Sequence, residues 1–203
     1  MRDDGCASCC EQQEAFRPVL WIALAINLAM FGVEIGAAVA SRSNALQADA
    51  LDFLGDAANY GVSLTVSGLA LSWRARAALA KGSTMAAFGL WVMANAIAHL
   101  VSGAVPEPRT MGVVSVIAMA ANGAVALMLY RFRVGEANMR SVWICARNDV
   151  LGNIAVLLAA MGVAATGERW PDSVVAVAMA CLALTGGWSV NRQAVAELRA
   201  ARS

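Results

Sequence analysis

Two pairs of potential metal ligands stand out because each pair is spaced four residues apart inside an apolar segment. Asp52 and Asp56 form one pair, and Cys145 and Asp149 form the other. Residues i and i+4 of an α-helix lie on one face, a turn apart. Two facing helices would supply four ligands, which suits tetrahedral zinc. A thiolate favours zinc or cadmium over magnesium or calcium, whereas the three carboxylates leave cobalt, iron and manganese as weaker candidates.

Ionisable residues inside apolar segments are costly, and here acids outnumber bases. Placing one such residue at the centre of a membrane span costs about 2.5–3.5 kcal/mol on insertion scales. The single base is Arg147, and the acids are Glu34, Asp49, Asp52, Asp56 and Asp149. We expect protons or a metal ion to neutralise these acids. The alternative for any one of them is a protonated carboxyl that is hydrogen-bonded between helices.

The composition is that of an integral membrane protein. Of the 203 residues, 60% are hydrophobic and 14% are charged, with a mean hydropathy of +0.62. Soluble domains carry about 25% charged residues, so lipid replaces water around most of this chain. The net charge of +1 gives no indication of nucleic-acid binding. The first 17 residues contain four acids, which is unlike a signal peptide.

Six segments are long and apolar enough to predict an all-α protein with six transmembrane helices. They are Pro18–Ala40, Ala45–Trp73, Thr84–Val105, Thr110–Tyr130, Met139–Thr166 and Ser173–Val190. With both termini in the cytoplasm, the outer loops hold only Arg42, Arg109 and Arg169. The inner segments then hold Arg2, Arg17, Arg74, Arg76, Lys81, Arg131, Arg133, Arg140, Arg192, Arg199 and Arg202. Eleven cations against three favour cytoplasmic termini.

The predicted organisation is a six-helix transport domain, residues 18–190, between two short cytoplasmic tails. The tail of residues 1–17 contains Cys6, Cys9 and Cys10, and the tail of residues 191–203 can form at most a short helix. Three cysteines within five residues could capture metal at the cytoplasmic mouth. The alternative is a tail with incidental thiols.

Two stretches resemble the cation diffusion facilitator family. Asn27-x3-Phe31-x2-Glu34 followed by Ser43-Asn44-Ala45-Leu46-Gln47-Ala48-Asp49-Ala50-Leu51-Asp52-x3-Asp56 is similar to the first two helices of that family. Asn138-Met139-Arg140-x4-Cys145-x3-Asp149-x2-Gly152 is similar to its fifth helix. The resemblance covers both site-bearing regions, whereas the third, fourth and sixth segments match in hydropathy only.

The resemblance implies a six-helix antiporter, usually a homodimer, that moves zinc, cadmium, cobalt, iron or manganese out of the cytoplasm in exchange for protons. It also places the metal ligands on Asp52, Asp56, Cys145 and Asp149. One departure is Cys145, where the family usually has histidine, and this should favour softer ions. The other is the family's cytoplasmic domain after the sixth helix, which we expect to be absent. A dimer would then use the membrane helices, where Gly89, Gly103 and Gly162 permit close approach.

For several other polar residues, the sequence leaves two possible roles open. Asp49 could line the exit path or cap the start of its helix. Glu34 and Asn27 could support the site or line a water cavity, or they could make interhelical hydrogen bonds. Arg147 points away from the ligand face and could pair with Glu34 or reach a dimer contact. His99 is expected to hydrogen-bond between helices rather than to bind metal.

The sequence therefore predicts a multi-pass transporter in the cell membrane. We expect this membrane to be a bacterial inner membrane. We do not expect the protein to be an enzyme. No prosthetic group is expected, because zinc or cadmium would be the cargo. The alternative is a membrane metal sensor or carrier subunit that binds metal without translocating it.

Overall fold

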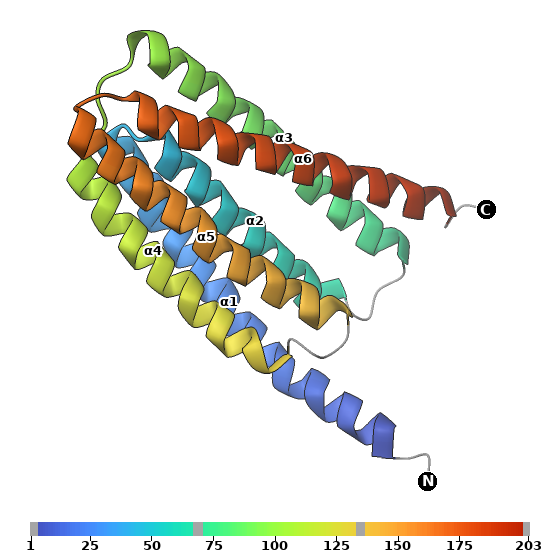
Figure 1. The fold of residues 1–203 in the computed structure, drawn as a ribbon. Coiled ribbons are helices and arrows are strands. Elements are labelled where there is room, and N and C mark those ends of the chain that lie inside the picture. The colour runs from blue at the N-terminus through green and yellow to red at the C-terminus, as the bar shows by residue number, and fades with distance from the viewer. Residues whose placement is uncertain (1–3, 67–70, 133–136, 201–203) are drawn as a thin grey trace.

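The computed structural model describes residues 4–66, 71–132 and 137–200 (Figure 1). Within these ranges, the side chains of residues 4–15, 66, 71–74, 81, 102, 137–142, 144, 145 and 200 lie outside the description. The described backbone forms six α-helices and one short 3-10 helix. They are α1 Asp4–Ser41, α2 Asn44–Val66, α3 Leu71–Ser102, α4 Pro108–Leu129, η1 Tyr130–Phe132, α5 Ala137–Thr166 and α6 Trp170–Ala200.

All the described helices except α2 and η1 contain a stretch that is long and apolar enough to cross a membrane. At 1.5 Å per residue, the 23 residues of α2 also reach across a hydrocarbon core of about 30 Å. However, every 18-residue stretch of α2 contains Asp49, Asp52 and Asp56. The acids that the sequence singles out are thus the residues that make α2 more polar than an ordinary membrane span.

The junction between α2 and α3 differs from the prediction. The second segment was expected to continue to Trp73, with a break from Arg74 to Gly82, but α2 ends at Val66 and α3 already begins at Leu71. The predicted break is wrong because arginine, lysine and alanine are good helix formers. Hydropathy marks where a helix becomes polar, which here lies inside α3.

The six α-helices divide into a group of four and a pair. Helices α1, α2, α4 and α5 pack together, while α3 and α6 pack mainly against each other. Figure 1 shows this pair diverging from α2 and α5 toward the end of the molecule where both termini lie. Leu20, Tyr60 and Leu129 are buried at one end of the four-helix group. Ala48 of α2 joins the group to the pair by packing against Val92 and Ala176.

Glycines bring α3 and α6 into close backbone contact. A Cβ atom added to Gly187 of α6 would lie 2.7 Å from the carbonyl oxygen of Gly82 in α3. A Cβ atom on Gly89 would lie 3.2 Å from Cγ of Leu184 in α6. Gly89 therefore faces a helix of its own chain, and Gly162 likewise faces Pro171. The expectation that these two glycines lie at a dimer surface is wrong, because intrachain contacts occupy them.

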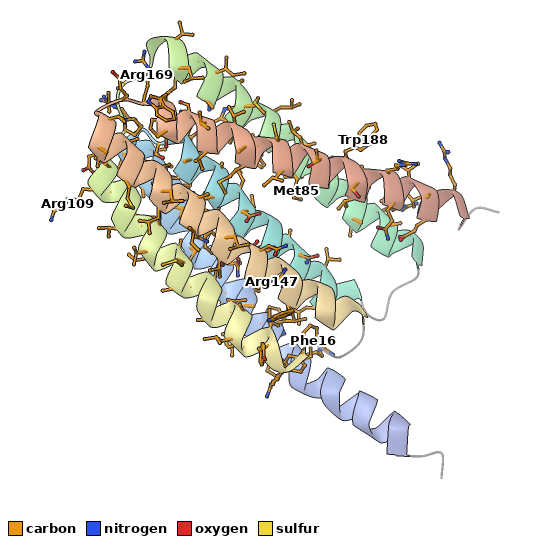
Figure 2. The ribbon with its side chains drawn as sticks, in the orientation of Figure 1. Phe16, Met85, Arg109, Arg147, Arg169 and Trp188 are labelled. Carbon is orange, nitrogen blue, oxygen red and sulfur yellow. The ribbon has the colours of Figure 1, made fainter. Side chains whose placement is uncertain are left out.

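At the end of the molecule opposite the termini, hydrogen bonds join the start of α6 to α2 and α3. The guanidinium of Arg169, which directly precedes α6 (Figure 2), donates to carbonyl oxygens of Leu100 and Gly103 at the end of α3. The buried carboxylate of Asp172 accepts hydrogen bonds from the start of α2. The pair is thus joined to the group of four at one end and separates from it toward the other.

Candidate functional site

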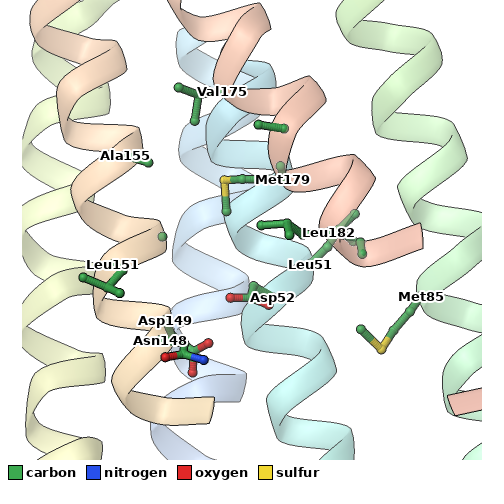
Figure 3. A pocket seen from close by; sticks show the side chains of 14 residues that line it. Leu51, Asp52, Met85, Asn148, Asp149, Leu151, Ala155, Val175, Met179 and Leu182 are labelled. Carbon is green, nitrogen blue, oxygen red and sulfur yellow. The ribbon is translucent and has the colours of Figure 1, made fainter. Parts of the chain in front are cut away.

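A cavity of about 510 Å³ lies between the four-helix group and the α3–α6 pair (Figure 3). Asp52 of α2 and Asp149 of α5 both line it, as does Asn148. The rest of its wall is mostly apolar and includes Ala48, Leu51, Met85, Leu151, Gly152, Ala155, Val175, Ala178, Met179, Leu182 and Ala183. Two carboxylates from distant parts of the sequence therefore lie at the wall of the same, mostly apolar cavity.

The start of α2 sets the position of Asp52. The Ser43 hydroxyl accepts a hydrogen bond from the backbone N–H of Leu46 at 3.1 Å, so Ser43 is the N-cap of this helix. Ala48 and Leu51 then pack toward the α3–α6 pair. Asp52 follows one position later and is half-buried at the cavity wall. A carboxylate in this position is shielded from bulk water but can be reached by a small cation.

Asp56, one turn further along α2, is half-buried and does not line the cavity. Its Oδ2 atom accepts a hydrogen bond from the hydroxyl of Tyr60 at 3.1 Å. Tyr60 is fully buried and belongs to the core of the four-helix group. Asp56 therefore stands on the predicted helix face with its orientation fixed by Tyr60, and its role as a ligand remains a prediction.

The side chain of Cys145, the fourth predicted ligand, lies outside the described residues. So do the side chains of Cys6, Cys9 and Cys10. Among the side chains that are described, no three His, Cys, Asp or Glu residues are close enough together to hold a metal ion. The structure thus brings Asp52 and Asp149 to one cavity, and the complete ligand set stays a prediction.

Three polar residues that the sequence associates with the site are buried elsewhere in the four-helix group. Asn27, Glu34 and Asp49 have 1%, 0% and 0% of their surface exposed, and none of them lines the cavity. The Asn27 amide donates to the carbonyl oxygen of Ala23 at 2.8 Å. Asp49 lies beyond the first turn of α2, so it does not cap that helix.

Arg147 does not pair with Glu34. Its guanidinium is exposed, lies 5.5 Å from the ring centroid of Trp143, and donates to Oδ1 of Asn148 at 3.1 Å (Figure 2). Because Asn148 also lines the cavity, Arg147 holds a polar side chain at the cavity wall beside Asp149.

Sequence reasoning missed two polar residues, Asn148 and Asp172. Asn148 looked unremarkable because an amide between two candidate ligands does not share their helix face. Asp172 was assigned to the loop before the sixth segment, although it is fully buried and binds the start of α2. The available signal was the Ser43-Asn44 pair before an apolar run, which is typical of a helix start, but it does not reveal a partner 129 positions away.

The sequence is similar to a known domain family and to known cation efflux proteins. The family model described as "Cation efflux transmembrane domain" matches residues 20–199. The metal cation efflux system protein CzcD of Cupriavidus metallidurans is 25% identical over 181 residues, which cover 83% of this chain and 57% of that protein. The cation efflux system protein CzcD of an Alcaligenes strain gives the same values. A cadmium, cobalt and zinc/H(+)-K(+) antiporter of Bacillus velezensis is 28% identical over 123 residues, 59% of this chain and 39% of that protein.

The chain thus spans little more than half the length of the CzcD relatives. The matched region contains α2, the cavity-lining residues, four of the five span-forming stretches and most of the first one, Phe16–Ser41. By this match over most of its length, the chain belongs to the cation efflux family, the cation diffusion facilitators, a family of membrane transporters for metal cations.

Proposed function

We propose that this protein carries divalent metal ions out of the cytoplasm in exchange for protons, with zinc or cadmium as its main cargo. The ion would bind to Asp52, Asp56, Cys145 and Asp149 between α2 and α5. The observation that carries this proposal is the shared cavity. Asp52 and Asp149, from two helices far apart in the sequence, line one chamber of about 510 Å³.

The walls of this chamber suit a cation. Its mostly apolar lining lowers the local dielectric, and that strengthens the attraction between a carboxylate and a metal ion. The two CzcD relatives are named as cation efflux proteins, and the Bacillus velezensis relative is named as a cadmium, cobalt and zinc antiporter. Cys145 as a fourth ligand would shift the preference within this group toward softer ions.

We further propose that α2 is a sixth span, which puts both termini on one side of the membrane. The distribution of arginine and lysine favours the cytoplasm for that side. The α3–α6 pair diverges from α2 and α5 toward the end where the termini lie (Figure 1). In this orientation the divergence faces the cytoplasm, from which metal would enter.

In the proposed cycle, a metal ion enters from the cytoplasm and displaces protons from its ligands. Metal coordination removes the proton of a thiol, so Cys145 would be protonated when empty and a thiolate when loaded. After the helices reorient, protons from outside compete for the ligands and release the metal. The N-terminal thiols of Cys6, Cys9 and Cys10 would raise the local metal concentration at the mouth. A homodimer through the membrane helices would complete the assembly.

The test is metal flux in proteoliposomes that contain the purified chain and a metal-sensitive dye. Asp52→Asn and Asp149→Asn should each reduce zinc and cadmium flux at least tenfold, because each removes a charged ligand from the cavity. Glu168→Gln, a charge-neutralising change at an exposed loop position, is the matched control and should transport like the native chain. Native flux in either cavity variant would reject the site. Metal binding without any flux in the native chain would instead indicate a sensor or carrier subunit.

A further inference from the structure

A pair of carboxyl groups is buried between α1 and α2, away from the cavity. Glu34 and Asp49 are both fully buried, with 0% of their surface exposed. The two side chains interact with each other, and Asp52 acts on both of them electrostatically. The side chains that act most strongly on this pair are acids, and Arg147 is turned away to Asn148.

Neither carboxyl group has a hydrogen-bond donor in the part of the chain that the structure describes. All four carboxyl oxygens of Glu34 and Asp49 are buried and lack a partner among the described residues. An ionised carboxylate only accepts hydrogen bonds, whereas a protonated carboxyl also donates one. Two adjacent buried carboxylates would be very unfavourable, because each charge is desolvated and repels the other. A proton on either group supplies the donor that the geometry lacks.

We propose that Glu34 and Asp49 share one proton and form a proton-binding site that is separate from the metal cavity. One carboxyl donates its O–H to an oxygen of the other, so the pair carries one negative charge instead of two. A tenfold change in occupancy corresponds to only about 1.4 kcal/mol, so a charge that arrives nearby can change the occupancy of such a site.

The proposal of a shared proton rests on the proposed function, because it identifies where an exchanged proton is held. Asp52 lines the cavity and also acts on the buried pair, so it connects the two sites electrostatically. A divalent ion at Asp52 would stabilise the doubly ionised pair. The O–H bond would then break with its electron pair remaining on the carboxylate oxygen, and the proton would pass to water. Metal departure would restore the bond.

The first experiment is infrared spectroscopy of the purified full chain without metal, in H₂O and D₂O at neutral pH. A protonated-carboxyl C=O band that shifts in D₂O is expected in the native chain and in the Glu168→Gln control. Glu34→Gln and Asp49→Asn should each lose this band, because the new amide donates to the remaining carboxylate. The conservative Glu34→Asp variant should keep a shifted band. A native chain without the band, or a band that survives both amide variants, would overturn the proposal.

The second experiment counts the protons released when cadmium binds in weakly buffered detergent solution. Glu34→Gln should still bind cadmium and should release one proton fewer per ion than the native chain. Loss of cadmium binding in Glu34→Gln would instead make the pair part of a metal site and reject the proton assignment. If the native chain shows the infrared band but no metal flux in proteoliposomes, the proposed transport function fails and the shared proton stands.

Discussion

The Asp172 carboxylate at the start of α6 accepts a hydrogen bond from the Ser43 hydroxyl at the start of α2. The same carboxylate accepts the backbone N–H groups of Asn44 and Ala45 at 2.9 and 3.1 Å. A residue of one helix therefore accepts hydrogen bonds from backbone N–H groups at the beginning of another, which have no acceptor within their own helix. Since Arg169 binds the end of α3 only three positions earlier, one turn of chain fixes the relative positions of α2, α3 and α6.

Asp172→Ala should destabilise the folded protein by about 2–3 kcal/mol. The change leaves a hydroxyl and two backbone N–H groups of α2 buried without an acceptor, and each such loss typically costs about 1–3 kcal/mol, not additively. Asp172→Asn keeps an acceptor oxygen and should lose less. Chemical unfolding in detergent, followed by circular dichroism, measures both. If the alanine variant unfolds at the native denaturant concentration, the contact does not stabilise α2.

Gly187→Ala should weaken the packing of α3 against α6. The added methyl group would lie 2.7 Å from the carbonyl oxygen of Gly82, so backbone must shift at an overpacking cost of about 1–3 kcal/mol. Gly123→Ala is the matched control, because a Cβ atom there meets nothing within 4 Å. The control should be at least as stable as the native chain. Equal unfolding midpoints for the two variants would show that the glycine contact is not needed.

Glu107 should make the start of α4 sensitive to acid. Its carboxylate accepts the backbone N–H groups of Arg109 and Thr110 at 3.1 and 2.7 Å. Interaction with the hydroxyl and backbone N–H of Thr110 lowers the pKa of this exposed carboxyl below its ordinary value of 4.5. Because the pKa is lower in the folded chain, this contribution is present above pH 4.5 and is lost as the pH falls through the lowered value.

Hydrogen exchange at the amides of Arg109 and Thr110 measures this effect. Exchange, corrected for its intrinsic pH dependence, should rise below pH 4.5 in the native chain. Glu107→Gln has no charge to lose and should show no such step. A native chain with the flat profile of the glutamine variant would exclude a charged cap.

Cys145→His should shift metal preference from cadmium toward zinc. Thiolate is the softer ligand and retains cadmium better, whereas imidazole suits zinc. Competitive uptake of the two ions into proteoliposomes gives the selectivity ratio, which should fall severalfold for cadmium. Cys181→Ser is the matched control, because Cys181 is an exposed cysteine on α6 outside the cavity lining. An unchanged ratio in Cys145→His would argue that Cys145 does not bind the metal.

The sequence predicted the parts of the fold that depend on hydropathy and helical spacing. Long apolar segments mark the helices, and the four-residue spacing puts Asp52 and Asp56 on one face of α2. The predicted break from Arg74 to Gly82 was wrong because arginine, lysine and alanine continue a helix even where an apolar segment ends; these residues lie inside α3. The family resemblance, confirmed by the match over residues 20–199, nominated α2 and α5 as the helices that carry the site.

Contacts between helices that are distant in the sequence could not be predicted from the sequence. Spacing along one helix says nothing about its partner, so the capping of α2 by Asp172 could not be inferred from either segment alone. The same holds for Glu34 and Asp49, which were known to be acids in apolar surroundings but not to lie together. Asn148 lines a cavity whose wall also includes residues of α2, α3 and α6, and this depends on how the helices pack rather than on periodicity.

The most direct test is X-ray absorption spectroscopy of one bound zinc ion in a background with Cys6, Cys9, Cys10 and Cys181 changed to serine. We predict four ligands, with one sulfur at about 2.3 Å and oxygen at about 2.0–2.2 Å. In that background, Asp52→Cys and Asp149→Cys should each raise the sulfur count from one to two, because each replaces an oxygen ligand of the same ion. A sulfur count that stays unchanged in either variant would contradict a metal ion shared between α2 and α5.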